Sequence, residues 1–102
     1  VDKDVSINDG IKMAEVCAKA LLSQLKAACN GDLDKVIRVV KLGGFVASSP
    51  DFTDHPKIIN GASDLIVKIF EEKGKHSRFA VGVASLPLNA PVEIEGIFEI
   101  KN

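Results

Sequence analysis

The sequence contains no tryptophan and no tyrosine, and its aromatic content is limited to five phenylalanines and two histidines. Proteins that bind single-stranded nucleic acids stack bases on exposed aromatic rings, so this composition argues against such a platform. The formal net charge is -1 and no run of like charge occurs, so no basic surface is expected to attract a nucleic acid. Aliphatic side chains must therefore form most of the core.

Cysteine is scarce, with only Cys17 and Cys29 in 102 residues. Twelve residues apart on one predicted helix, they would be separated by roughly 18 Å, which is too far for a disulfide. We therefore expect two reduced thiols, with Cys17 buried. A metal site needs several converging ligands, and the isolated His55 and His76 do not supply them, so no metal is predicted.

Long apolar runs are absent too. No stretch approaches the roughly 20 apolar residues that a helix needs to cross a bilayer. No segment combines a basic start, an apolar middle and a small-residue cleavage site in the manner of a signal peptide. We therefore expect a cytoplasmic protein, with residues 1–102 forming a single domain.

Two segments have the apolar spacing of amphipathic helices. The first is predicted over Ser6–Cys29, where apolar residues recur at steps of three and four and Ser6 can cap the N-terminus. The second begins near Pro56, because proline suits the first turn of a helix, and ends at Gly74. Each helix has one apolar face to bury.

Three segments are predicted to be strands, at residues 34–48, 78–85 and 92–100. The first is apolar on both faces, and its Gly43 and Gly44 suggest a β-bulge, or a close approach by another backbone or a ligand. The third alternates, with apolar residues on one face and Glu93, Glu95 and Glu99 on the other.

The order α-β-α-β-β predicts an α+β fold in which two helices cover one face of a sheet. The glutamates of the last strand then lie on the open face. Three strands are few for helices of this length. We therefore expect that strands belonging ahead of Val1 are missing from this chain or are contributed from elsewhere.

Arg78 begins the second predicted strand among small neighbours. Its guanidinium could bind a carboxylate through two hydrogen bonds, or it could form an ordinary ion pair at a surface or interface. Glu93 could likewise belong to a solvated face, or could move protons if another subunit partly buried it. In a simple hairpin of the last two strands, Glu93 would face Ala84, roughly 20 Å from Arg78. A shared site therefore requires another strand order or contact between subunits.

Residues 77–97, SRFAVGVASLPLNAPVEIEGI, resemble the R-S/A-x-V-x-V-x-x-L-P … V-E-I-E-A-I signature of the RidA/YjgF family, also called endoribonuclease L-PSP. Residues 36–52, VIRVVKLGGFVASSPDF, resemble the family's upstream strand and turn, and the IIN that follows contains the matching asparagine. The resemblance implies a chorismate-mutase-like fold. It also implies a homotrimer with a barrel-like core and ligand sites in the clefts between subunits. The family's leading strand pair is missing from this chain.

The resemblance also implies an activity, the hydrolysis of reactive enamines and imines such as 2-aminoacrylate to 2-keto acids and ammonia, with no cofactor. Arg78 would bind the substrate carboxylate, assisted by the backbone N–H of Ala80. Glu93 would orient or activate the attacking water, and Asn60 would lie near the site. The second helix lacks the tyrosine of the best-known deaminases. The alternatives are a non-catalytic or regulatory trimer that binds 2-keto acids and, less favoured, an endoribonuclease.

Overall fold

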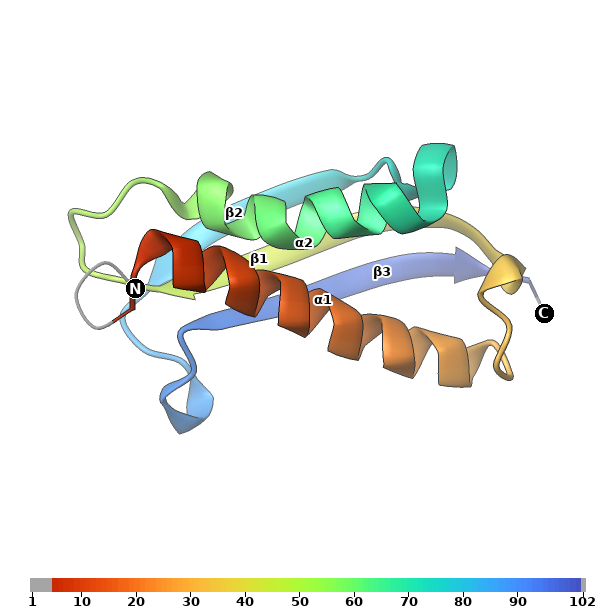
Figure 1. The fold of residues 1–102 in the computed structure, drawn as a ribbon, viewed down its shortest axis with the longest axis horizontal. Coiled ribbons are helices and arrows are strands. Elements are labelled where there is room, and N and C mark those ends of the chain that lie inside the picture. Colours follow the sequence, from red (N-terminus) through yellow and green to blue (C-terminus); the bar gives the residue numbers. More distant parts are fainter. Residues whose placement is uncertain (1–4, 102) are drawn as a thin grey trace.

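A computed structural model describes residues 5–101 of the chain (Figure 1). The helices and strands are α1 (Ile7–Ala28), β1 (Val36–Ala47), α2 (His55–Phe70), β2 (Ser77–Val83) and β3 (Val92–Ile100). Three short 3-10 helices join them, η1 (Leu33–Lys35), η2 (Glu71–Gly74) and η3 (Pro87–Asn89). The predicted α-β-α-β-β order is confirmed. Any strands ahead of Val1 lie outside the described residues.

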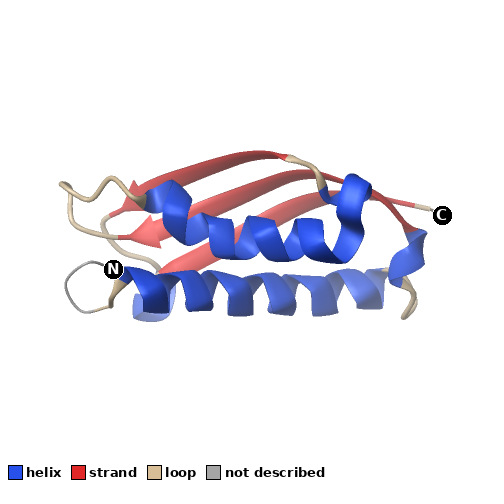
Figure 2. Ribbon diagram, turned by 45° about the horizontal axis from the view of Figure 1, so that its top comes forward, coloured by secondary structure: helices blue, strands red, loops and turns tan. Residues whose placement is uncertain are grey.

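The two helices lie side by side on one face of a three-stranded sheet (Figures 1 and 2). The strand order is β2-β1-β3, with β1 parallel to β2 and antiparallel to β3. No helix within residues 5–101 covers the opposite face, which we call the open face. The α+β fold with helices on a single face is therefore confirmed.

Both helices begin where the sequence predicts. The Ser6 hydroxyl accepts a hydrogen bond from the backbone N–H of Asp9 at 3.1 Å and so caps the first turn of α1. Helix α2 begins at His55 and ends at Phe70, four residues before the predicted Gly74. There the backbone turns at Glu71, with φ of 55°, into η2. A helix cannot continue through that left-handed conformation.

The core lies between the helices and the sheet, in two clusters. One cluster joins the first half of α1 to α2, to the end of β1 and to the start of β3. Its residues are Ala14, Ala18, Val46, Ile58, Ile59, Ala62 and Val92. The other joins the end of α1 to α2 and β1, through Leu22, Leu25, Cys29, Val36, Val39, Leu42 and Ile66. Aliphatic side chains supply both, as the composition predicted.

The predicted bulge at Gly43 and Gly44 is wrong. Strand β1 pairs without interruption through both glycines, and its register shifts lie near its beginning, between residues 36 and 41. The glycines are needed because side chains fill the space that a Cβ would occupy. A Cβ on Gly44 would lie 2.5 Å from the Ile59 side chain, and one on Gly43 would collide with the Phe79 ring.

The cysteine prediction is correct in part. Both thiols are free, but Cys29 is the buried one, with 1% of its surface exposed, whereas Cys17 is half-buried. The Cys17 Sγ lies 3.8 Å from the backbone oxygen of Val92, at the start of β3. No helix among residues 5–101 is both long enough and apolar enough to cross a membrane.

Candidate functional site

Arg78 lies on the helix-covered side of the sheet, at the edge formed by β2. Its register partner on β1 is Leu42, which is 1% exposed and packs under the helices. Side chains of neighbouring strands at one register level share a face, so Arg78 points towards α2. Ala80 follows two residues later on the same face, beside Gly44, and packs against the core.

The Arg78 guanidinium is held on one side by α2. Its Nη1 donates to Asn60 Oδ1 at 2.6 Å and to Ser63 Oγ at 3.3 Å. These two bonds use both hydrogens of that nitrogen. The Nε and Nη2 hydrogens, on the outer edge of the fork, have no partner among the described residues. That edge can take a carboxylate through two parallel hydrogen bonds.

A cavity of about 300 Å³ opens beside this guanidinium, between α2 and the start of β2. Its lining residues are Asn60, Ser63, Val67, Lys75, His76 and Arg78. Lys75 is paired with Glu72 at 3.0 Å, and both side chains are largely exposed, so that ion pair contributes little to holding Lys75. Arg78 is therefore the fixed cation of this cavity.

Of the residues that line this cavity, the sequence placed only Asn60 and Arg78 at the site, and the hydrogen-bonded pair Ser63 and His76 was among those missed. Ser63 is only 8% exposed, and its Oγ lies 3.1 Å from Nε2 of His76. The His76 Nδ1 lies 2.5 Å from the backbone oxygen of Gly74. One signal was present in the sequence: Ser63 is a polar residue on the buried face of α2, next to Ala62.

Glu93 lies on the other face of the sheet. Its register partner is Phe45, which pairs in turn with Val81 of β2, so these three side chains share the open face. Glu95 and Glu99 alternate with apolar neighbours in the same way, and all three glutamates are exposed. The predicted acidic open face of β3 is confirmed.

The open face also carries apolar side chains. Phe45 and Phe79 meet edge to face, with ring centroids 5.3 Å apart, and Lys41 Nζ lies 5.2 Å from the centre of the Phe79 ring. Val81 is 41% exposed and Ile97 is 58% exposed. An uncovered sheet face with exposed aliphatic and aromatic groups is typical of a surface that packs against another protein.

Glu93 acts electrostatically on Cys17. Burial raises the pKa of the Cys17 thiol, and the negative charge of Glu93 raises it further. Both effects disfavour the thiolate, so this cysteine is a poor nucleophile at neutral pH.

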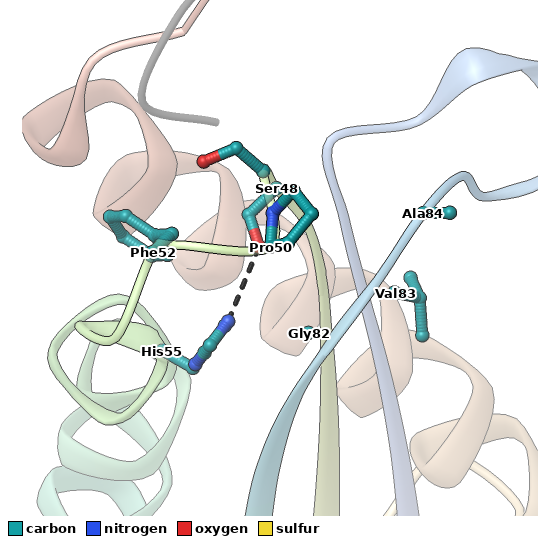
Figure 3. A pocket seen from close by; sticks show the side chains of 8 residues that line it. Ser48, Pro50, Phe52, His55, Gly82, Val83 and Ala84 are labelled. Carbon is teal, nitrogen blue, oxygen red and sulfur yellow. Dashed lines mark hydrogen bonds between the residues drawn. The ribbon is translucent and has the colours of Figure 1, made fainter.

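A second cavity, of about 400 Å³, lies where β1 and β2 end and α2 begins (Figure 3). Ser48 Oγ and His55 Nε2 are 3.2 Å apart there, and the Phe52 ring meets the His55 ring edge to face. Gly82 lets the imidazole lie against β2, since a Cβ there would collide with its Nε2. Within residues 5–101, no three acidic, histidine or cysteine side chains gather to hold a metal.

Comparison with known proteins identifies the family. A family model described as "YjgF/chorismate mutase-like, putative endoribonuclease" matches residues 1–99. The chain belongs to this YjgF family. The resemblance noted in the sequence and the chorismate-mutase-like form of the fold are thereby confirmed.

Similar YjgF-type proteins are longer than this chain. Protein TCP17 of Trypanosoma cruzi is 50% identical over 99 residues, which are 96% of this chain and 61% of TCP17. Atu1372 from Agrobacterium tumefaciens, a crystal structure of unknown function, is 53% identical with a TM-score of 0.98, over 100% of this chain and 65% of that one. A structure from Shewanella oneidensis, described as a putative endoribonuclease, is 31% identical with a TM-score of 0.91 over 96% of this chain and 64% of that one. The chain thus spans less than two thirds of each.

Proposed function

We propose that this YjgF-family chain is a subunit of an enzyme that hydrolyses reactive 2-imino acids and their enamine tautomers, such as 2-aminoacrylate, to 2-keto acids and ammonia. The observation that carries the proposal is the Arg78 guanidinium, which Asn60 and Ser63 fix through Nη1 beside a cavity that all three residues line. A 2-imino acid presents a carboxylate next to the carbon that water must attack. A fixed fork therefore orients the reacting carbon as well as binding the anion.

The chemistry needs few groups. The enamine first gains a proton at its terminal carbon and becomes an imine. Water then adds to the imine carbon, giving up a proton to a base while the nitrogen gains one. The tetrahedral intermediate expels ammonia and leaves a ketone. Arg78 would hold the carboxylate throughout, and the backbone N–H of Ala80, two residues along β2, would support it.

We propose that Glu93 of a neighbouring protomer provides the base. A carboxylate can orient the water and accept its proton during attack. Within one chain, Glu93 and Arg78 differ by three register positions and are on different edge strands, roughly 10 Å apart along the strands and roughly 10 Å across the sheet. They also lie on opposite faces. Only a second copy of the chain could bring a Glu93 carboxylate to the Arg78 cavity.

The exposed apolar groups of the open face support assembly through that face. Val81, Phe79 and Ile97 would be withdrawn from water if open faces packed together in a homotrimer with a barrel-like centre. Glu93 and Glu95 lie among these residues, so they would become partly buried on assembly.

The test is keto-acid release from 2-aminoacrylate generated in situ by a pyridoxal-phosphate-dependent dehydratase. We expect the protein to accelerate pyruvate formation and Arg78→Ala to abolish the acceleration. Arg38→Ala is the matched control, since Arg38 is the other arginine and pairs with Glu99 at 3.2 Å away from the cavity. An Arg78→Ala variant as active as the unmodified protein would refute the role of Arg78.

A second candidate function is a non-catalytic binder of 2-keto acids, possible because the cavity beside Arg78 contains no carboxylate among its lining residues. Such a binder would be stabilised by pyruvate without accelerating imine hydrolysis. The endoribonuclease activity named for the Shewanella oneidensis structure fits these charges poorly. RNA binding relies on clustered cations, whereas the open face carries glutamates and the net charge is -1.

A further inference from the structure

The bonds behind Arg78 form a continuous chain of four groups. Arg78 Nη1 lies 3.3 Å from Ser63 Oγ, Ser63 Oγ lies 3.1 Å from His76 Nε2, and His76 Nδ1 lies 2.5 Å from the Gly74 backbone oxygen. Gly74 is buried and Ser63 is 8% exposed, so this series of hydrogen bonds ends inside the protein. Neither Ser63 nor His76 reaches the open edge of the guanidinium.

The direction of every hydrogen bond in this chain is determined. A backbone carbonyl only accepts, so His76 must carry its hydrogen on Nδ1. In the neutral ring, Nε2 is then an acceptor, and Ser63 must donate its only hydrogen to it. The Ser63 oxygen is left with lone pairs, and it accepts from Arg78 Nη1. Neutral His76 thereby orients Ser63 as an acceptor for Arg78.

We propose that Ser63 and His76 are positioning residues for the substrate carboxylate, and that protonation of His76 weakens this role. They fix Nη1 of Arg78 against α2, which leaves the Nε–Nη2 edge turned towards the cavity. The inference rests on the proposed anion-binding role of Arg78 and deepens it. It assigns a task to two residues that do not themselves touch the substrate.

Protonation would reverse one bond. With a hydrogen on Nε2, His76 donates to Ser63, whose oxygen would then accept from two cations at once, His76 and Arg78. The two cations repel each other, and the Ser63 hydroxyl hydrogen loses its acceptor. Both effects disfavour this arrangement. Carboxylate binding should therefore weaken as the pH falls.

The other charges around His76 do not offset this repulsion. Lys75, its neighbour in the chain, lines the same cavity and adds positive charge, while Glu72 of η2 is paired with Lys75. The residues of α2 that line the cavity, Asn60, Ser63 and Val67, carry no charge. On β1, Lys41 extends over the Phe79 ring on the open face.

The first measurement reads the His76 tautomer by ¹⁵N NMR of the imidazole ring in the unliganded protein. The proposal requires the neutral ring to carry its hydrogen on Nδ1 and to accept at Nε2. A neutral ring protonated at Nε2 would overturn the proposal, whatever the protein binds or hydrolyses. Ser63→Ala should change the Nε2 resonance, because it removes the hydroxyl that donates to it.

The second measurement is pyruvate affinity as a function of pH. Ser63→Ala and His76→Ala should each weaken binding by about 5- to 10-fold, the effect of losing one oriented hydrogen bond. His76→Gln should restore most of the affinity, because an amide oxygen can accept from Ser63. It should also flatten the loss of affinity at low pH, because an amide does not titrate. If His76 had only a structural role, His76→Gln would not flatten the pH dependence of pyruvate affinity.

The second Ser–His pair provides the matched control. Ser48 and His55 are 3.2 Å apart in the other cavity, so His55→Ala removes a comparable hydrogen bond outside the Arg78 site. It should leave pyruvate affinity and its pH dependence unchanged. If Arg78→Ala abolishes pyruvate binding while Ser63→Ala, His76→Ala and His55→Ala all bind as the unmodified protein does, the positioning role is refuted and the proposed function survives. If Arg78→Ala itself binds pyruvate unchanged, the proposed function fails, and the positioning role with it.

Discussion

Arg78 and Glu93 lie on the two outer strands of the sheet and on its opposite faces, with β1 between them. The Arg78 side chain is directed towards α2, where it donates to Asn60 and Ser63, whereas Glu93 shares the open face with Phe45. One chain therefore holds an anion-binding group in a cavity whose lining residues include no carboxylate. The central claim is that a neighbouring protomer completes the site.

Glu93→Gln should separate turnover from binding. The amide keeps the size of the side chain but cannot accept a proton from water, so imine hydrolysis should fall by about 100-fold or more. Pyruvate affinity should change little, because Arg78 is intact. Glu95→Gln, two residues along the same strand and face, is the control and should remain active. Equal losses in the two variants would show that the face needs charge in general and not a base at residue 93.

Cys17 should react slowly with iodoacetamide, because burial and the Glu93 charge both raise its pKa and leave little thiolate at about pH 8. Glu93→Gln removes the negative charge, which lowers the pKa and raises the thiolate fraction. The alkylation rate of Cys17 should therefore increase, although burial, the larger cause, remains. Site-resolved mass spectrometry would measure it. An increase of the same size in Glu95→Gln would argue against a specific effect of Glu93.

Gly44→Ala should destabilise the fold more than Gly43→Ala. A Cβ on Gly44 would meet Ile59, which is fully buried in the core and has little room to move. Overpacking of that kind costs about 1–3 kcal/mol in the free energy of unfolding. A Cβ on Gly43 would meet the half-buried Phe79 ring and the flexible Glu95 side chain. Urea denaturation of both variants checks the order, and the reverse order would contradict the packing described for β1.

Ser6→Ala should lower the free energy of unfolding by about 1 kcal/mol, because the backbone N–H of Asp9 loses its side-chain acceptor. Ser23→Ala is the control. Its hydroxyl bonds only to the Lys19 backbone oxygen at an exposed position within α1, and alanine favours a helix. Thermal unfolding followed by circular dichroism measures both. A Ser6 variant as stable as the protein itself would show that the cap is dispensable.

Local sequence patterns predicted the helices and strands well. Ser6 and the apolar spacing placed α1, and the strict alternation from Val92 to Ile100 gave both the limits and the two faces of β3. These features depend on neighbours within a few residues, which a sequence displays directly. The end of α2 was placed too late, because Gly74 marks the end of η2 and the chain already turns at Glu71.

Relations between distant segments were harder to predict. The short connection between β2 and β3 suggested a hairpin, yet β1 lies between them. Its apolar character on both faces is what a central strand requires, and that signal could have given the order. The glycines of β1 were misread because the side chains that need the space, Ile59 and Phe79, come from α2 and β2.

The candidate site was predicted in part. Arg78 was named from the sequence pattern and from the resemblance, and Asn60 from the resemblance alone. Arg78 Nη1 donates to Asn60 Oδ1 at 2.6 Å, and the catalytic role of Arg78 and the substrate-binding roles of both residues stay predictions. Ser63 was not named, and His76 was considered only as an isolated histidine unable to form a metal site. Their importance depends on a chain of bonds between α2, Gly74 and β2, which becomes visible only when the fold brings these segments together.

Mixing two inactive variants tests whether neighbouring protomers share the catalytic site. Arg78→Ala and Glu93→Gln chains would be purified separately, unfolded together and refolded in equal amounts, and imine hydrolysis would be measured beside each variant refolded alone. If one protomer supplies Arg78 and its neighbour supplies Glu93, about a quarter of all interfaces in the refolded mixture contain both groups intact, and about a quarter of the normal activity should return. Mixed oligomers, verified by mass spectrometry, that remain as inactive as the separate variants would contradict the claim.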